Sequence, residues 1–414
     1  MPTEPIDPRS ARRNLILLVV ASGLYVLMAS IDLTLTGLVG YGIAPTHALA
    51  TLPYALIYIA GTISPPFAAM LMERLGRRAA FTIGAYFAAI GGLVSVWAVS
   101  AQDFALFCVG TALVGAYQGF AVYYKYAAAD SVPAERRPRV VSYVVGAGVV
   151  AALGGPFIAV GSRHLLATTY AGAYAVVSLI ALVTVLVLLP LRMTRPLATE
   201  PTVDETVEVA RRPLRLVVTQ AVFLVGLSGM AIGYFVMMLL MTVAPIAGAM
   251  HHHSTDQNAL VIQWHLIGMF APSLASGILV VKLGASRVLA VGTALAVLAA
   301  TVNLVGTSQL DFLVALGGIG VAWNLMQVAG TTMVIESYRP AERARTQAAA
   351  ESSTAVAATL GALGSGVLLD TIGWRSLNVV ALCALALPAA LTIWQLARAG
   401  GRFGLARGAT SSTR

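Results

Sequence analysis

Side chains that bind soft metal ions gather in one stretch of the chain, residues 229–273. Two methionines stand one helical turn apart in its first part, and a histidine and a methionine stand one turn apart further on. Residues four apart share a helical face, so each pair can present both side chains to one point. Thioether and imidazole groups suit Cu(I), whereas Mg²⁺ requires oxygen ligands. The pattern is compatible with a copper site without charged ligands, whose candidate residues are Met237, Met241, His265 and Met269.

Three consecutive histidines, His251, His252 and His253, stand between the two pairs and could collect metal outside the membrane. Each of these residues also has a simpler explanation. Methionine in an apolar helix commonly fills space, and a histidine run can be an ordinary polar loop. His265 needs a polar partner at that depth, in a cavity or on a neighbouring helix. Only the combination of these residues makes a metal site as good an explanation as packing and an ordinary polar loop.

A second set of polar side chains favours an organic substrate instead. Aromatic and amide groups make the cytoplasmic half of the segment near residue 120 polar, and two amides interrupt the apolar segment near residue 325. Such groups suit a cavity for a small aromatic solute. The candidate residues are Tyr117, Gln118, Tyr123, Tyr124, Asn324 and Gln327.

Asp32 is the one carboxylate well inside an apolar segment of the first half of the chain. An ionisable group inside the membrane is a functional candidate by default, here for proton coupling. The alternative is a position near the outer interface, where Asp32 would cap a polar turn.

The composition requires a membrane to hold these residues. Of the 414 residues, 58% are hydrophobic and 10% charged, with a mean hydropathy of +0.83. A soluble domain carries about 25% charged residues. We expect twelve transmembrane helices, an all-α membrane fold, because each crossing needs about 20 apolar residues. The apolar segments are 14–38, 49–72, 79–99, 104–127, 140–161, 169–191, 214–244, 258–281, 286–306, 311–335, 346–369 and 373–396.

The basic residues predict the orientation of these helices. With both termini in the cytoplasm, all of the 26 Lys and Arg residues except Arg163 and Arg375 lie on the cytoplasmic side. Positive charge marks cytoplasmic loops, so this distribution predicts both termini inside. We expect a multi-pass protein of a bacterial inner membrane that lies in the lipid bilayer and binds no nucleic acid.

The chain repeats itself at half its length. Residues 133–136 read Pro-Ala-Glu-Arg and recur at 340–343, and Leu-x-x-[Arg/Lys]-Leu-Gly occurs at 71–76 and 279–284. Duplicated halves are typical of carriers whose substrate site lies between them. We therefore expect a six-helix half over 1–191, a cytoplasmic linker over 192–213 and a second six-helix half over 214–414.

The loop 69–78, Ala-Met-Leu-Met-Glu-Arg-Leu-Gly-Arg-Arg, resembles the signature loop of the major facilitator superfamily. Alanine replaces its first glycine and glutamate its aspartate. The resemblance implies the major facilitator fold in two pseudo-symmetric halves, with alternating access as the mechanism. It implies a conformational role for Leu71, Glu73, Arg74, Gly76, Arg77 and Arg78.

A further resemblance concerns the substrate. Met237-x-x-x-Met241 followed by His265-x-x-x-Met269 looks like the paired motifs of bacterial copper importers of this superfamily that supply cytochrome c oxidase assembly. The resemblance implies that these four residues bind copper as transported substrate, with a copper chaperone as a possible partner. Riboflavin importers of a related branch look broadly similar here, so the importer of riboflavin or another small organic solute stays the alternative.

Motifs of other classes are absent. The sequence contains no Walker motif, no His-Glu-x-x-His and no Gly-x-Ser-x-Gly, so we expect no enzyme and no resident cofactor. Gly155-Pro156 matches the glycine–proline motif of drug/proton antiporters only weakly, so this function is less favoured. A non-transporting membrane metal sensor is also less favoured, because it would need a soluble signalling domain. The sequence thus predicts a monomeric secondary carrier that imports copper, or alternatively riboflavin or a similar solute.

Overall fold

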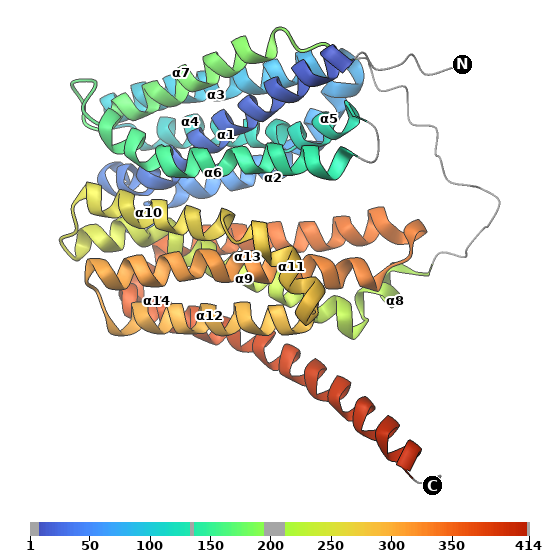
Figure 1. The fold of residues 1–414 in the computed structure, drawn as a ribbon. Coiled ribbons are helices and arrows are strands. Elements are labelled where there is room, and N and C mark those ends of the chain that lie inside the picture. Colours follow the sequence, from blue (N-terminus) through green and yellow to red (C-terminus); the bar gives the residue numbers. More distant parts are fainter. Residues whose placement is uncertain (1–7, 133–135, 194–211, 412–414) are drawn as a thin grey trace. The chain divides into compact units, whose positions relative to one another are not determined.

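The computed structural model describes residues 8–132, 136–193 and 212–411 (Figure 1). Every regular element in these ranges is a helix. In the first part of the chain the helices are α1 (Pro8–Ile43), η1 (His47–Leu49), α2 (Leu52–Leu75), α3 (Arg77–Ala101), α4 (Phe104–Ala121), α5 (Tyr124–Asp130), α6 (Arg137–Ser162) and α7 (Ala171–Leu188). In the second they are α8 (Leu214–Val218), α9 (Ala221–Met250), α10 (Thr255–Phe270), α11 (Ser273–Leu283), α12 (Ala285–Val305), α13 (Gln309–Ser337), η3 (Pro340–Glu342) and α14 (Arg343–Ser411).

Within the described residues, nine helices are long and apolar enough to cross a membrane, or ten if the bent pair α10 and α11 is one span. The expected segments 346–369 and 373–396 both lie in α14 and meet at a kink at Gly373, whose φ of +75° and ψ of 172° are not helical. The 54-residue apolar stretch from Arg345 to Arg398 counts once among the nine. This stretch is long enough for two crossings, since each crossing needs about 20 residues. Of α6, only Leu153–Ser162 stands out as an apolar helix. Twelve spans therefore stays a prediction.

Several expected segments are broken in the structure. Segment 104–127 is divided into α4 and α5, and segment 214–244 begins with the short α8 before α9 starts at Ala221. Segment 258–281 bends by 47° where α10 gives way to α11. Pro272 lies at this bend and lacks the N–H that a continuous helix needs. Apolar periodicity alone did not reveal these breaks.

Both copies of the repeated Leu-Gly loop make the same turn. Gly76 follows α2 with φ +85° and ψ 159°, and Gly284 follows α11 with φ +86° and ψ 147°. Each glycine N–H donates to a carbonyl of the preceding helix, and the next helix begins directly after it. Only glycine adopts such a conformation without strain, which explains why the motif ends in this residue.

The chain forms two compact units. Unit 1 comprises residues 1–204, 242–267 and 366–371, and unit 2 comprises 205–241, 268–365 and 372–414. Most of the expected linker, 194–211, lies outside the described residues.

Small residues allow close helix contacts inside each unit. In unit 1, a Cβ at Gly115 of α4 would lie 2.3 Å from the Ile57 carbonyl oxygen of α2. In unit 2, Gly226 of α9 and Gly330 of α13 face each other, and a Cβ on either would lie within 2.8 Å of the other's carbonyl oxygen. Small residues are the usual means by which membrane helices approach closely, since burial from water does not drive them together.

Candidate functional site

The four candidate copper ligands are divided between the two units. Met237 and Met241 of α9 are 3% and 1% exposed and belong to unit 2, as does the partly exposed Met269. His265 of α10 is fully buried and belongs to unit 1. Among the described residues, no three His, Cys, Asp or Glu side chains come together to hold a metal. A copper site would therefore depend on methionine sulfur.

Met230, on the same face of α9 as Met237, has a packing role. Its sulfur lies 3.8 Å from the Thr331 hydroxyl of α13, which donates to it. A Cβ at Gly330 would lie 2.6 Å from the Met230 Cγ. At this level the methionine face of α9 packs on α13.

The histidine run follows α9. The backbone N–H groups of His251, His252 and His253 donate to carbonyls of residues 247–249 and so close the C-terminal end of the helix. His252 has a φ of +64°, and its side chain is exposed, as is that of His251. The run therefore has a capping role in addition to any role as a metal collector.

Tyr117 and Tyr124, two of the expected cavity residues, lie in the interior of unit 1. Each is 1% exposed, and their hydroxyls are 3.0 Å apart. Tyr124 also packs edge-on against Phe81, with ring centroids 4.9 Å apart. In this structure both tyrosines support the helix packing and expose almost no surface to a solute.

Partly exposed side chains lie around this buried pair. Gln118 packs over Gly61 of α2, and the Tyr123 hydroxyl donates to the Pro65 carbonyl at 3.2 Å. Tyr25 of α1 packs edge-on against Tyr117, with centroids 5.8 Å apart. Sequence reasoning missed Tyr25, although it lies two turns before Asp32 on the same face of α1.

Asp32 is 2% exposed, and neither carboxylate oxygen accepts a hydrogen bond from a described residue. It interacts electrostatically with the phenols Tyr54 of α2 and Tyr174 of α7. The Tyr174 hydroxyl is 3.2 Å from the Thr36 hydroxyl, and the Tyr54 hydroxyl is 3.4 Å from that of Tyr58. Burying a carboxyl group without a hydrogen bond is costly, so Asp32 stays a functional candidate.

The two expected cavity amides in unit 2 bind backbone. Asn324 of α13 donates to the Met269 carbonyl at 2.8 Å and to the Ser273 hydroxyl at 2.7 Å, across the bend between α10 and α11. Gln327 donates to the Met230 carbonyl at 2.8 Å. Both side chains therefore hold neighbouring helices to α13.

An aromatic pair that the sequence analysis missed lies next to these amides. Tyr234 of α9 and Trp323 of α13 are both partly exposed and meet edge-on, with centroids 5.2 Å apart and an interplanar angle of 88°. The Trp323 indole nitrogen is buried and has no acceptor among the described residues. The sequence offered one indication of this pair, because Trp323 directly precedes the expected cavity residue Asn324.

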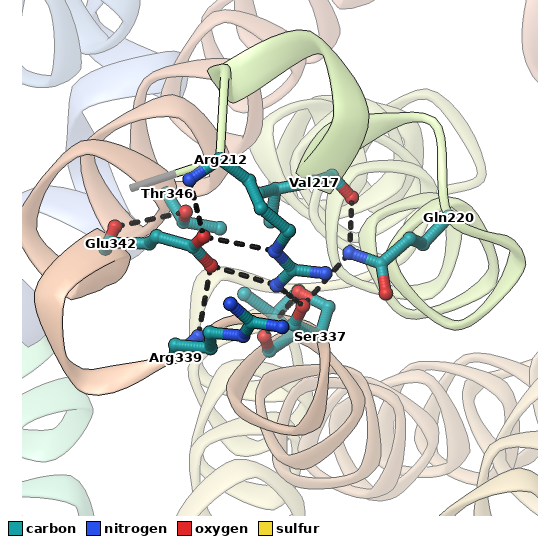
Figure 2. Close-up of polar contacts among 8 residues, drawn as sticks. Arg212, Val217, Gln220, Ser337, Arg339, Glu342 and Thr346 are labelled. Atoms are coloured by element: carbon teal, nitrogen blue, oxygen red, sulfur yellow. Dashed lines mark hydrogen bonds and ion pairs between the residues drawn. The ribbon is translucent and has the colours of Figure 1, made fainter. Parts of the chain in front are cut away.

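A polar cluster of unit 2 lies outside the apolar spans, where Arg212 meets Glu342 (Figure 2). The guanidinium donates to both carboxylate oxygens, at 2.9 and 2.7 Å, and to the Ser337 carbonyl at 3.1 Å. The backbone N–H groups of Arg212 and Arg339 also donate to Glu342, which is 4% exposed. The guanidinium bonds, reinforced by the Arg339 N–H, lower the pKa of the Glu342 carboxyl from 4.5 to about 2.

Glu342 belongs to the second copy of the repeated Pro-Ala-Glu-Arg motif. In the first copy, residues 133–135 lie outside the described residues.

Unit 1 has an anchor of its own near the other end of the expected linker. The Asn14 amide of α1 donates to the Arg192 carbonyl at 2.7 Å and accepts from the Arg192 N–H at 3.3 Å. Asn14 is 5% exposed. Residues flanking the undescribed stretch 194–211 are thus each bound within one unit.

The signature-like loop lies at the end of α2. Arg77 pairs with Asp130 at the end of α5, whereas Glu73, Arg74 and Arg78 are exposed. Leu71 is partly buried, and Gly76 makes the turn described above. The pair links the start of α3 to the end of α5 within unit 1.

Comparison with known proteins identifies the family. The model of the Major Facilitator Superfamily matches residues 14–271 and 227–410. The riboflavin transporter RfnT of Brucella anthropi is 32% identical over 373 residues, which cover 90% of this chain and 93% of that protein. The uncharacterized MFS-type transporter YdeG of Bacillus subtilis is 25% identical over 384 residues, 88% of this chain and 87% of YdeG.

Solved structures show the same fold. The nucleoside transporter NupG has a TM-score of 0.67 at 14% identity and covers 93% of this chain and 98% of its own. A bacterial homologue of the human lysosomal transporter Spinster, inward-facing and unoccupied, has a TM-score of 0.71 at 15% identity, covering 93% and 97%. With a family model over nearly the whole chain and a 32% identical relative over nine-tenths of it, this multi-pass membrane protein belongs to the Major Facilitator Superfamily of secondary transporters.

Proposed function

We propose that this carrier imports riboflavin, or a closely related flat heteroaromatic solute, across a bacterial inner membrane by alternating access. The observation that carries the proposal is the 32% identity to riboflavin transporter RfnT over 90% of the chain. This was the alternative that the sequence analysis left open. Twelve helices with both termini in the cytoplasm, a monomer and the absence of enzymatic activity belong to the same proposal.

The chemistry of the spans supports an aromatic solute. Unit 1 presents the partly exposed Tyr25, Gln118 and Tyr123 around a buried tyrosine pair. Unit 2 presents Tyr234 and Trp323 beside two amides. Aromatic walls with a few oriented polar groups are typical of pockets for flat organic ligands.

Copper import ranks behind riboflavin in this proposal. The soft-ligand pattern of Met237, Met241, His265 and Met269 stays a prediction, as do metal collection at His251–His253 and a chaperone. Met230 uses its sulfur in packing against Thr331, which favours the packing explanation for its helix face. None of the relatives described above carries a name that refers to copper.

One experiment separates the two substrates. Cells without their own riboflavin importer would express the chain, and uptake of labelled riboflavin and of labelled copper would be measured side by side. We expect riboflavin uptake above the empty vector and copper uptake equal to it. Met241→Ala, at matched membrane levels, serves as the control variant and should leave riboflavin uptake within about a factor of two, since packing losses fall mainly on stability. Copper uptake that collapses in Met241→Ala, without riboflavin uptake, would reverse the assignment.

A further inference from the structure

Trp323 has a hydrogen-bond donor that unit 2 itself does not use. Its indole Nε1 is buried on α13, and no described residue accepts from it. Buried polar groups are nearly always paired, because an unpaired buried donor is costly. Other buried side-chain atoms also lack a described partner, among them the indole nitrogen of Trp374. The Trp323 N–H differs in lying beside the partly exposed ring of Tyr234, and a partner bound only during part of the cycle would satisfy it.

The neighbouring donors are already committed to the protein. The Asn324 amide nitrogen binds the Met269 carbonyl and the Ser273 hydroxyl, and the Gln327 amide nitrogen binds the Met230 carbonyl. These bonds join α9, α10 and α11 to α13. Within the described part of this cluster, the Trp323 N–H is thus a donor without an acceptor in the protein.

Tyr234 fixes the position of the Trp323 ring. The two rings meet edge-on across α9 and α13 at 5.2 Å and 88°. Edge-to-face contacts are attractive beyond the burial of area, so they help to hold a ring in one orientation. Both residues keep part of their surface exposed, and the pair therefore combines an aromatic face with an oriented donor.

We propose that Trp323 recognises the heteroaromatic ring of the transported substrate, with its indole N–H donating to a ring carbonyl oxygen or ring nitrogen. The inference rests on the proposed function. It assigns to Trp323 a contact with the ring of riboflavin and not with its ribityl chain. The isoalloxazine ring is flat and presents several such acceptors along its edge. A polar group that stays unpaired without its ligand discriminates strongly against analogues that lack the matching atom.

Trp323→Phe tests this contact, because phenylalanine keeps an aromatic ring beside Tyr234 and removes the N–H. We expect the KM for riboflavin to rise about two- to tenfold, the loss of one neutral hydrogen bond. Vmax at matched membrane levels should stay near the wild-type value. Lumichrome, the ring system without the ribityl chain, is used as a competitive inhibitor, and its inhibition constant should rise by the same factor.

Two further variants complete the test. Trp97→Phe on α3 removes an indole that is 70% exposed, and it should change neither constant. Trp323→His restores a ring N–H and should recover part of the lost affinity, whereas a residue needed only for packing would not respond to that donor.

Each other result overturns the proposal. An unchanged KM, or a raised KM with an unchanged lumichrome constant, removes Trp323 from the ring contact while wild-type riboflavin uptake leaves the proposed function intact. A fall in Vmax alone identifies a packing residue. If the wild-type protein imports no riboflavin, the proposed function fails, and the assigned ligand of Trp323 fails with it.

Discussion

At the residue scale, Asp32 is a buried carboxylate whose two oxygens accept no hydrogen bond from a described residue. It interacts electrostatically with the phenols of Tyr54 and Tyr174. The tyrosines give it a polar but uncharged environment. We propose that Asp32 couples uptake to protons, because an ionisable group inside a membrane span is a functional candidate by default.

Asp32→Asn should therefore remove the response of uptake to protons. Asparagine has nearly the same shape and carries no titratable proton, so an inward proton gradient should no longer stimulate riboflavin uptake. Exchange of labelled for unlabelled riboflavin should continue. Membrane vesicles with imposed gradients provide the measurement, and Asp370→Asn, an exposed carboxylate on α14, is the control. Full stimulation in Asp32→Asn would mean that Asp32 is a structural residue.

The residue types in the sequence selected the candidate residues well, but they did not predict what each side chain does. The apolar surroundings of Asp32 and Asn324 in the sequence were enough to select them, because polar groups are rare in membrane spans. Whether a side chain binds a backbone carbonyl, as Asn324 does, depends on a neighbouring helix far away in sequence. Arg212 and Glu342 were missed for the same reason, since their partnership spans 130 residues.

At the element scale, the bend between α10 and α11 depends on α13. Pro272 interrupts the helix, and Asn324 supplies hydrogen bonds on both sides of the break, to the Met269 carbonyl and the Ser273 hydroxyl. Periodicity predicted one straight segment here. It could not reveal the bend, because the donor that stabilises it comes from another segment.

Asn324→Leu should destabilise this bend. Interhelical hydrogen bonds in membranes contribute about 0.6 kcal/mol on average and at most about 1.7 kcal/mol, so we expect a loss in this range. Thermal unfolding of the purified protein in detergent measures it. Thr332→Ala is the matched control on α13, since the Thr332 hydroxyl donates to the Val328 carbonyl of its own helix and to no other described residue. Equal midpoints for both variants would contradict the role of Asn324.

At the scale of the whole molecule, Glu342 anchors the first described residue of unit 2. It holds Arg212, the first described residue after the stretch 194–211, to the loop before α14 (Figure 2). The pKa of Glu342 is lowered from 4.5 to about 2. The charged carboxylate therefore contributes its full stabilisation of the folded protein at pH values above about 4.5. That contribution disappears as the pH falls from about 4.5 towards 2.

Glu342→Gln should lower the unfolding midpoint by a few degrees at neutral pH. The difference from wild type should be constant between pH 6 and 8, since the carboxyl stays charged there, and it should shrink as the medium becomes more acidic than about pH 4.5. Midpoints measured in detergent across this range provide the test. Glu351→Gln, an exposed glutamate on α14, is the control. A difference that does not depend on pH would rule out the charge as its source.

The two anchors also say where extra chain can be tolerated. Arg192 is held by Asn14 and Arg212 by Glu342, which leaves 19 residues between them. The entropy of closing a loop grows slowly with its length, so doubling the number of residues between the anchors would cost only about 0.6 kcal/mol. The helices α9, α10 and α14 each contribute residues to both units. An insertion between Arg192 and Arg212 would therefore leave these helical connections between the units unchanged.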